Sequence, residues 1–221
     1  MIDEIQDYTA AQLMAIRAWF PAAKYMLLGD ENQAIAEGRA TMDQVRRIFR
    51  TRREPSELSL LTSYRSSPEI TALFTSLMED KEAVRVRSVR RPGEAPLFRP
   101  CRNRQEWESC LIRTLEELEE KEGLTGILCA QKKTAERASA LLGDRAVRIR
   151  SESGRLPVSG AVILDLPLAK GLEFDRVILA DAGPDSYPDS LLGRHRLYTA
   201  VSRATHRIAL LSEGPLTPLL K

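Results

Sequence analysis

Residues 162–179 read VILDLPLAKGLEFDRVIL, and this stretch indicates the fold class. It holds two short apolar runs, 162–164 and 177–179, on either side of a Lys-Gly-Leu-Glu segment. Short apolar runs bounded by turn residues are typical of strands that are buried on both faces of a sheet. The stretch therefore predicts two strands of a mainly parallel sheet.

The same rhythm extends along the chain, where strand-length apolar runs alternate with helix-periodic segments. Further strands are predicted at 25–28, 58–61, 127–130, 147–149 and 208–211. Helices are predicted over 10–19, 68–78, 105–122, 132–142 and 194–204. Residues 83–104 contain Pro and Gly and predict a small hairpin or arm. We therefore expect an α/β protein whose mainly parallel sheet is flanked by helices.

The composition is that of a globular protein: 221 residues, 43% hydrophobic, 29% charged, with a net charge of +2. No stretch approaches the ~20 apolar residues that a membrane span needs. The N-terminus lacks the pattern of a signal peptide, so we expect a cytoplasmic protein without membrane contact. Cys101, Cys110 and Cys129 are spaced too widely for a two-cysteine metal knuckle, and they argue against a disulfide framework.

Two clusters of arginines suit a polyanion such as nucleic acid. A solvated arginine-rich surface explains them equally well. The first cluster comprises Arg46, Arg47, Arg50, Arg52 and Arg53. The second comprises Arg85, Arg87, Arg90, Arg91, Arg99, Arg102 and Arg104.

Acidic and amide side chains mark two segments near the N-terminus. Asp3 and Glu4 form a pair that can hold a nucleotide-bound magnesium ion (Asp3) and orient an attacking water (Glu4). Gly-Asp-Glu-Asn-Gln at 29–33 follows the apolar run 25–28 directly. There Gln33 can sense a γ-phosphate through its amide, and Asp30 can orient its neighbours. A solvated acidic pair and a plain turn are the alternative interpretations.

Five segments in order resemble the motifs of UvrD-like superfamily 1 DNA helicases. The second and third motifs match Asp-Glu-Ile-Gln-Asp at 3–7 and Gly-Asp-Glu-Asn-Gln at 29–33. The fourth to sixth match Leu-Thr-Ser-Tyr-Arg-Ser at 61–66, Ala-Lys-Gly-Leu-Glu-Phe at 169–174 and Leu-Tyr-Thr-Ala-Val-Ser-Arg-Ala at 197–204. The resemblance spans residues 2 to about 211. It implies the RecA-like P-loop NTPase fold of the second helicase lobe, plus a short remnant of the first lobe.

The resemblance also implies roles in an ATP site that contains Mg²⁺. Tyr64 stacks on the adenine, and Arg65 reaches the γ-phosphate through a fork that can make two contacts. Arg203 is a second phosphate contact, and these two arginines are expected to share one edge of the sheet. Gly171 allows close approach of the backbone, and Glu173 contacts the ribose or a partner in the bound state.

Lys170 and the local sequence point to partners. Lys170 is expected to contact nucleic acid or phosphate, although a solvated charge at a turn is the alternative. The segments 3–8, 28–35, 168–175 and 202–206 resemble HelD-like proteins, which associate with RNA polymerase. The residues between Arg65 and Lys170 are already filled by predicted strands and helices. They leave no room for the large domain that processive UvrD-type helicases insert there.

The phosphate-binding loop Gly-x-x-x-x-Gly-Lys-Ser/Thr does not occur, because the sequence contains no Gly-Lys dipeptide. We interpret 1–38 as a remnant of the first RecA-like domain, 39–56 as a basic connector and 57–221 as the second RecA-like domain. The chain is then either a truncated piece of a longer protein or one part of a natural split protein. Residues 1–38 are expected to pack irregularly on the second domain or to swap onto another copy.

Two functions are compatible with these motifs. The first is half of an ATP-driven DNA helicase or translocase, which by itself binds ATP very weakly and hydrolyses none. Its partners would be DNA and the missing N-terminal RecA-like domain. The second is a non-catalytic module that docks on RNA polymerase or nucleic acid. Arg65, Arg203 and Gln33 favour the motor, since a binding module has no need of them.

Overall fold

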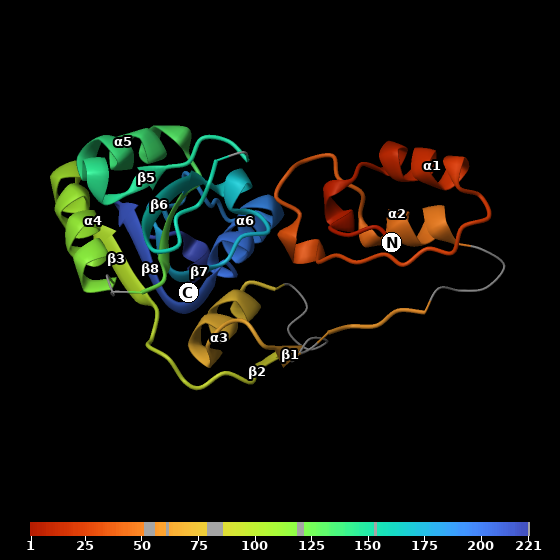
Figure 1. Ribbon diagram of the computed structural model, residues 1–221, viewed down its shortest axis with the longest axis horizontal. Coiled ribbons are helices and arrows are strands. Elements are labelled where there is room, and N and C mark those ends of the chain that lie inside the picture. The colour runs from red at the N-terminus through yellow and green to blue at the C-terminus, as the bar shows by residue number, and fades with distance from the viewer. Residues whose placement is uncertain (51–55, 61, 79–85, 119–121, 153, 221) are drawn as a thin grey trace. The chain divides into compact units, whose positions relative to one another are not determined.

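The structure is a computed structural model that describes residues 1–50, 56–60, 62–78, 86–118, 122–152 and 154–220. The chain divides into two compact units, Met1–Leu60 and Leu61–Lys221, and each has a hydrophobic core of its own (Figure 1). Several residues of the sequence predictions lie outside the described residues, namely Arg52, Arg53, Leu61, Arg85 and 119–121.

A six-stranded, wholly parallel sheet forms the centre of the second unit, with the strand order β3-β8-β7-β4-β6-β5. Its strands are β3 (Leu97–Cys101), β4 (Leu124–Cys129), β5 (Val147–Arg148), β6 (Gly160–Asp165), β7 (Phe174–Leu179) and β8 (Ala204–Glu213). The central strands β4, β6 and β7 carry the apolar runs, because parallel strands are covered on both faces. The predicted α/β architecture is confirmed.

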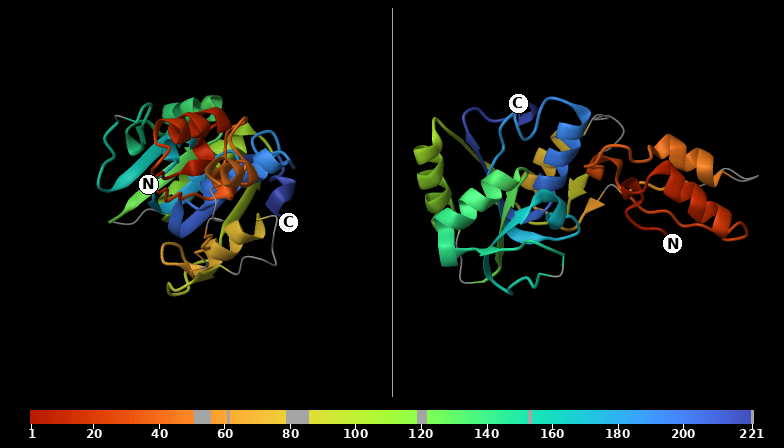
Figure 2. Two further views of the ribbon diagram at one scale, coloured as in Figure 1. Left: turned by 90° about the vertical axis from the view of Figure 1, so that its right-hand side faces the viewer. Right: turned by 90° about the horizontal axis from the view of Figure 1, so that it is seen from above.

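Helices cover both faces of this sheet (Figures 1 and 2). They are α3 (Pro68–Ser76), α4 (Arg104–Leu118), α5 (Lys132–Leu142) and α6 (Leu191–Val201), with the short 3₁₀ helices η3 (Gly143–Arg145), η4 (Leu166–Ala169) and η5 (Pro218–Leu220). Helix α3 begins at a capping residue: the Ser67 hydroxyl accepts a hydrogen bond from the Ile70 amide, and Pro68 occupies the first turn.

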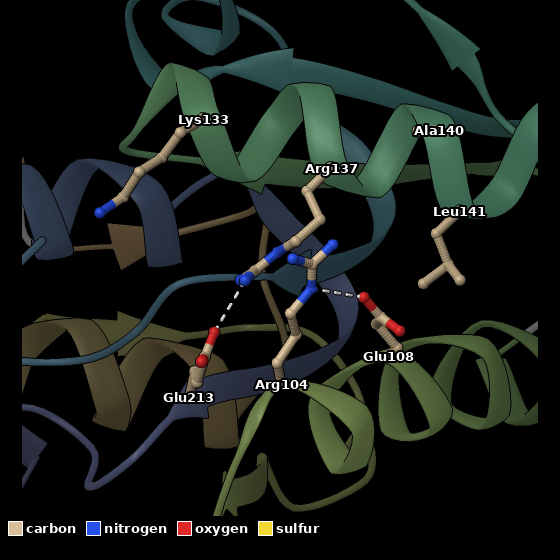
Figure 3. A pocket seen from close by; sticks show the side chains of 7 residues that line it. All are labelled: Arg104, Glu108, Lys133, Arg137, Ala140, Leu141 and Glu213. Atoms are coloured by element: carbon tan, nitrogen blue, oxygen red, sulfur yellow. Dashed lines mark hydrogen bonds and ion pairs between the residues drawn. The ribbon is translucent and has the colours of Figure 1, made fainter.

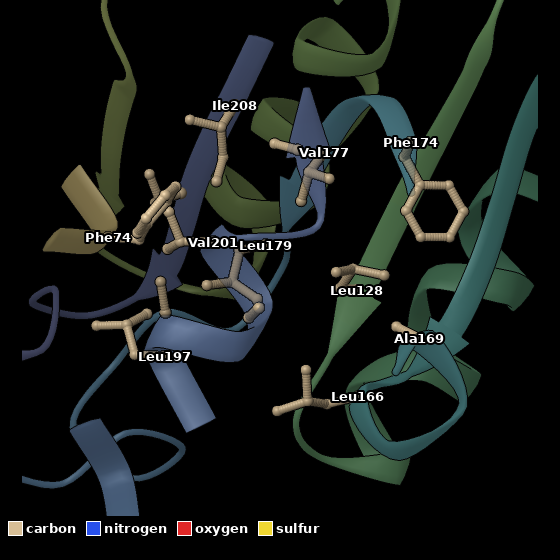
Figure 4. Close-up of a cluster of buried hydrophobic side chains, with 14 of the residues drawn as sticks. Phe74, Leu128, Leu166, Ala169, Phe174, Val177, Leu179, Leu197, Val201 and Ile208 are labelled. Carbon is tan, nitrogen blue, oxygen red and sulfur yellow. The ribbon is translucent and has the colours of Figure 1, made fainter. Parts of the chain in front are cut away.

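The two faces carry separate cores. Helices α4 and α5 pack on one face, where Trp107 is fully buried and its indole N–H donates to the Ala180 carbonyl at 2.7 Å. Helices α3 and α6 and the η4 turn pack on the other face, where Phe74, Leu166 and Leu197 meet strand side chains (Figure 4). The sheet is therefore closely packed on both faces, and its strand ends can hold side chains in fixed positions.

The segment before β3 differs from the prediction. The predicted strand at 58–61 is wrong, since 58–60 has no regular structure and Leu58 and Leu60 are 94% and 92% exposed. Pairing starts instead at β1 (Thr62–Ser63), which lies parallel to β2 (Arg87–Ser88) in a separate two-stranded sheet. Of the two alternatives predicted for 83–104, a hairpin or an arm, the described residues 86–104 do not form the hairpin, because β2 and β3 pair with distant strands in different sheets.

Helix α6 ends earlier than the predicted range 194–204. Ser202 is its C-cap, and Ala204 already begins β8. The backbone of β8 pairs with β3 and β7, and most of its side chains are buried, so these residues belong to the sheet and not to the helix. The start also moves, because the Ser190 hydroxyl caps the helix by accepting from the Gly193 amide at 3.1 Å.

The first unit consists of the 3₁₀ helices η1 (Ile5–Asp7) and η2 (Glu31–Gln33) and the helices α1 (Ala10–Trp19) and α2 (Met42–Phe49). The predicted helix 10–19 is confirmed, and Thr9 begins it with a capping box to Gln12. The predicted strand 25–28 is reduced to an isolated parallel bridge between Ile2 and Leu27. One pair is too short a ladder to make a strand.

Helix α2 lies within the range 39–56 that we interpreted as a connector. Its residues Val45 and Phe49 belong to the core of the first unit with Ile5 and Leu13, so this stretch is more than a bare linker. The assignment of 1–38 to a first RecA-like lobe stays a prediction. Among the described residues, no helix combines the length and apolar character that crossing a membrane requires.

Candidate functional site

Two neighbouring strands bring the fifth and sixth motif segments together. Strands β7 and β8 begin side by side, with Phe174 paired to Ala204, and the Phe174 amide donates to the Arg203 carbonyl at 3.0 Å. Residues that directly precede two neighbouring parallel strands lie at the same end of the sheet. Glu173 and Arg203 therefore lie at adjacent strand starts.

Arg65 reaches this edge from the segment after β1. Its Nη2 atom lies 2.7 Å from Oε1 of Glu173, and both side chains are 46% exposed. The fourth and fifth motif segments are thus joined by an ion pair. The exposed guanidinium keeps access to solvent, as a group that contacts a triphosphate requires.

Arg203 contacts Leu172, the residue before Glu173 in the same loop. Unlike Arg65, Arg203 is only 2% exposed. Its Nη1 donates to the Leu172 carbonyl at 3.4 Å, and its Nε donates to the Thr199 carbonyl at 3.1 Å. Its Nη2 donates to the Ser202 hydroxyl at 3.1 Å. The two predicted arginines therefore meet consecutive residues, Leu172 and Glu173. The structure brings them to one edge, yet Arg203 is embedded where Arg65 is accessible.

Backbone contacts anchor the Arg65 segment to the start of β8. The Ser66 hydroxyl donates to the Ala204 carbonyl at 2.7 Å, and the Ser67 amide donates to the Thr205 carbonyl at 2.9 Å. The Ser88 hydroxyl of β2 donates to the Ser66 carbonyl at 2.7 Å. Both serines at 66 and 67 are buried, so the position of Arg65 is fixed by its neighbours.

Arg90 was missed as a site residue. Its Nε donates to the Tyr64 carbonyl at 3.1 Å, and its Nη1 lies 3.3 Å from Nε2 of His206. It thereby links the fourth motif to the residues after the sixth. The sequence showed Arg90 only as one of a cluster of arginines, and spacing alone could not single it out. The Tyr64 side chain is 72% exposed, which fits a ring that receives a flat ligand.

Gly171 and Lys170 lie in the loop between η4 and β7. Gly171 has a φ of 76°, a left-handed conformation that favours glycine, and among the described residues no atom beyond its two chain neighbours lies within 4 Å of where a Cβ would stand. Lys170 is half-buried at the end of η4. The open space around Gly171 is compatible with close approach of a ligand, and the role of Lys170 stays a prediction.

In the first unit, Gln6 joins the second and third motif segments. Gln6 is buried, its amide nitrogen donates to a Glu4 carboxylate oxygen, and its amide oxygen accepts from the Asp30 amide at 3.1 Å. A Cβ on Gly29 would clash with the Gln6 Oε1 atom and with Cγ2 of Ile5 at 2.7 Å, so a side chain at this position would force its neighbours to shift. Gln6 stands in the second motif, but its bridging role was not predicted.

Glu4 adopts a left-handed conformation with φ 49° and ψ 46°. This conformation is uncommon for a residue with a side chain, and such strain is often found at functional positions. The two carboxylate oxygens of Asp30 accept from the Asn32 amide at 3.0 Å and from the Gln33 side chain at 3.0 Å. Gln33 is thus held by Asp30.

The described residues contain no preformed cluster of metal-ligating side chains. No group of three or more His, Cys, Asp or Glu side chains in this part of the chain is arranged to hold an ion. One oxygen of Asp3 accepts from the Glu4 amide at 2.9 Å. The contact of Asp3 with a magnesium ion stays a prediction.

Two pockets lie away from these residues. One of about 670 Å³ opens between α4 and α5 (Figure 3), where Arg104 pairs with Glu108 at 2.8 Å and Arg137 pairs with Glu213 at 2.7 Å. The other, of about 460 Å³, lies at the carboxyl ends of β4 and β7 and shares part of that lining. None of the motif arginines lines either pocket. We place the candidate site at the strand starts, because the convergent side chains lie there.

Asp181 lines the second pocket and accepts hydrogen bonds from the amides just before α5. Its carboxylate accepts from the Ala130 and Gln131 amides at 3.0 and 2.9 Å. Burial raises the pKa of Asp181, and these amide hydrogen bonds act in the opposite direction. The positive end of α5 is thus already occupied by a carboxylate of the chain itself.

Ion pairs engage part of the second arginine cluster. Arg99 pairs with Glu117, Arg102 with Glu106 and Arg104 with Glu108. In the first cluster, Arg46 pairs with Asp43 and Glu57. For these four arginines, the pairs favour a solvated surface over a nucleic-acid contact.

Comparisons with known proteins agree with the motif resemblance. Residues 160–211 match the family model of the UvrD-like helicase C-terminal domain. The chain is also similar in structure to the C-terminal domain of a possible DNA helicase from Lactobacillus plantarum WCFS1. That likeness has a TM-score of 0.60 and 28% sequence identity, and covers 72% of this chain and 92% of that chain.

A weaker likeness, to the C-terminal domain of the DEAD-box protein Dbp5, has a TM-score of 0.37 and 20% identity over 54% of this chain and 76% of that chain. Comparison with curated proteins by sequence finds no match. The resemblance to the UvrD-like helicase C-terminal domain and its RecA-like fold is confirmed, whereas the closer resemblance to HelD-like proteins stays a prediction.

Proposed function

We propose that this chain, whose second unit resembles a UvrD-like helicase C-terminal domain, supplies the arginine and sensor side of the ATP site of a DNA helicase or translocase. The observation that carries the proposal is the convergence of Arg65 and Arg203 on Glu173 and Leu172. Guanidinium groups gathered at one edge stabilise the negative charge of a triphosphate undergoing transfer.

The accessible side chains fit part of an ATP molecule. Tyr64 presents an exposed ring for the adenine, and Arg65 presents an exposed guanidinium for phosphate oxygens. Gly171 leaves open space in the loop beside Glu173, which would contact the ribose. Bound ATP with Mg²⁺ would supply the hydrolysable phosphate bond and the charge that draws two lobes together.

Arg203 is proposed to have two roles: it connects α6 to the loop before β7, and it later contacts a phosphate. Its hydrogen bonds to Thr199 and Leu172 hold the end of α6 against the loop before β7. A direct phosphate contact requires that it exchange some of these partners. Arg65, which is accessible, is therefore the first of the two arginines to meet the triphosphate.

The acidic and amide residues of the first unit keep the roles that the resemblance implies. Glu4 would orient the attacking water, Asp3 would contact the magnesium ion, and Gln33, held by Asp30, would sense the γ-phosphate. The strained backbone of Glu4 supports a functional position. Lys170 would contact DNA or phosphate from the loop before β7.

The second candidate is a non-catalytic module that docks on RNA polymerase or nucleic acid, as the HelD-like segments suggest. The ion pairs within both arginine clusters count against broad electrostatic docking on nucleic acid. The exposed pair of Tyr64 and Arg65 beside an open loop favours the nucleotide site instead.

Complementation tests the proposed function. The chain is mixed with a separately produced P-loop domain of a UvrD-like helicase, and steady-state ATP hydrolysis is measured with and without single-stranded DNA. We expect hydrolysis from the mixture that DNA stimulates, and none from the chain alone, because these 221 residues contain no Gly-Lys phosphate-binding loop. A mixture that forms a complex but shows no more hydrolysis than its separate parts would contradict the proposal.

A further inference from the structure

The ion pair between Arg65 and Glu173 sets how the arginine is presented to a ligand. We infer that Glu173 is a positioning residue that holds the Arg65 guanidinium at the strand starts and competes with a triphosphate for it. This inference rests on the proposed function and adds a carboxylate that must be displaced before Arg65 can bind phosphate. The 2.7 Å contact between Nη2 and Oε1 is its direct evidence.

The backbone on both sides of Glu173 is fixed. The Leu172 carbonyl accepts from Arg203, and the Phe174 amide donates to the Arg203 carbonyl at 3.0 Å. The Phe174 ring is buried against β4, where a Cβ on Gly126 would meet it at 2.7 Å. The backbone that carries the Glu173 carboxylate is therefore held in place on both sides.

The backbone of Arg65 is fixed as well. Ser66 and Ser67 are buried and hydrogen-bonded to the start of β8. An ion pair between two held backbones loses less chain freedom on forming than one between two mobile loops. The neighbouring carboxylate Asp175 is engaged elsewhere, since it accepts from the Leu124 amide at 2.8 Å and lies near His206. Glu173 is thus the carboxylate placed to hold Arg65.

The pair is weak enough to exchange. Both side chains are 46% exposed, and ion pairs at such exposure are stabilised only slightly in water. A triphosphate carries more charge than one carboxylate and can accept both arms of the guanidinium fork. Removing the carboxylate should therefore tighten phosphate binding by about twofold to fivefold, the range that exposed ion pairs are worth.

A ribose contact by Glu173 would give a different result. Inorganic tripolyphosphate has no ribose, so a carboxylate that only binds ribose has no effect on its affinity. Competition for Arg65, in contrast, acts on any polyphosphate. The ribose-free probe therefore separates the positioning role from the role that the family resemblance implies.

The experiment uses the full chain labelled with ¹⁵N-arginine. The Arg65 Nε–H signal is assigned by its loss in Arg65→Lys and followed by NMR during titration with inorganic tripolyphosphate. Glu173→Gln is expected to shift this signal before any ligand is added and to lower the dissociation constant about twofold to fivefold. Glu108→Gln is the matched control, because it breaks the comparable exposed pair with Arg104 and should change neither quantity.

Three results would overturn parts of the account, each in a distinguishable way. An Arg65 signal unchanged by Glu173→Gln would remove the holding role. A dissociation constant that stays equal or rises in this variant would remove the competition. Tripolyphosphate that moves the Arg65 signal in no variant would overturn the proposed phosphate contact itself, and the shift caused by Glu173→Gln without ligand would still decide whether the pair forms.

Discussion

Arg65 and Arg203 meet the same loop but stand in opposite environments. Arg65 forms an ion pair with Glu173 at a half-exposed position. Arg203 is buried and donates to the carbonyls of Thr199 and Leu172. The motif resemblance implies the same kind of phosphate contact for both arginines, whereas their surroundings assign Arg203 a structural part as well.

The two arginines should therefore differ in their effect on stability. Arg203→Ala removes a charged donor from the buried Thr199 carbonyl and the part-buried Leu172 carbonyl, and should lower the free energy of unfolding by about 1–3 kcal/mol. Arg65→Ala should change it by no more than about 0.5 kcal/mol, as is usual at exposed positions. Urea unfolding followed by the fluorescence of the buried Trp107 measures both. Equal losses in the two variants would contradict this assignment.

The thiols should be inert while the protein is folded. Burial raises the pKa of Cys101 to about 12 and raises the pKa of Cys129 well above its usual value. Little thiolate is then present near neutral pH, and Cys110 is buried too. Iodoacetamide at pH 7.5 (about one unit below the pKa of a free thiol) should label no cysteine in the native chain and all three in urea. Rapid native labelling would show that these positions open.

At the scale of elements, the contact between β4 and the start of β7 supports the site. A Cβ on Gly126 would meet Phe174 ring atoms at 2.7–2.9 Å. Gly126→Ala should therefore lower the free energy of unfolding by about 1–3 kcal/mol through overpacking. Adding Phe174→Leu should relieve the clash, so the double variant should lose less than the two single losses together. Urea unfolding of the four proteins measures this, and strictly additive losses would disagree with it.

The central elements were predictable and the peripheral ones were not. Strands β4, β6, β7 and β8 carry apolar runs that burial on both faces requires, and α5 begins and ends at the predicted residues. The errors fall where the partner is distant in sequence. Strand β2 pairs with β1 rather than with a local neighbour, and no periodicity in 83–104 records that choice.

At the scale of the whole chain, the order of the motifs predicted which segments meet, but not how they are held. The pairing of β7 with β8 places Glu173 beside Arg203, as adjacent motifs suggest. The bridging roles of Gln6 and Arg90 come from contacts across 24 and 26 positions of sequence. Such contacts depend on the folded backbone, and residue type alone does not reveal them.

The chain by itself should not turn over ATP. With no Gly-Lys loop, it lacks the amides and the lysine that hold the phosphates, so occupancy of the site should be low. A phosphate-release assay with purified chain at millimolar ATP should stay at background, with and without DNA. Turnover that follows the protein through purification and disappears in Arg65→Ala would overturn this expectation.

The central claim is that Arg65 belongs to an ATP site, and single-turnover hydrolysis in the complemented system tests it most directly. The chain is mixed with the P-loop domain, and complex formation is first verified by sedimentation for each variant. We predict that Arg65→Ala slows hydrolysis by about 10³-fold, as expected for an arginine that stabilises the transferring phosphate. Arg104→Ala, an exposed arginine paired with Glu108 away from the site, should leave the rate unchanged. Equal rates for Arg65→Ala and Arg104→Ala in fully formed complexes would contradict the account.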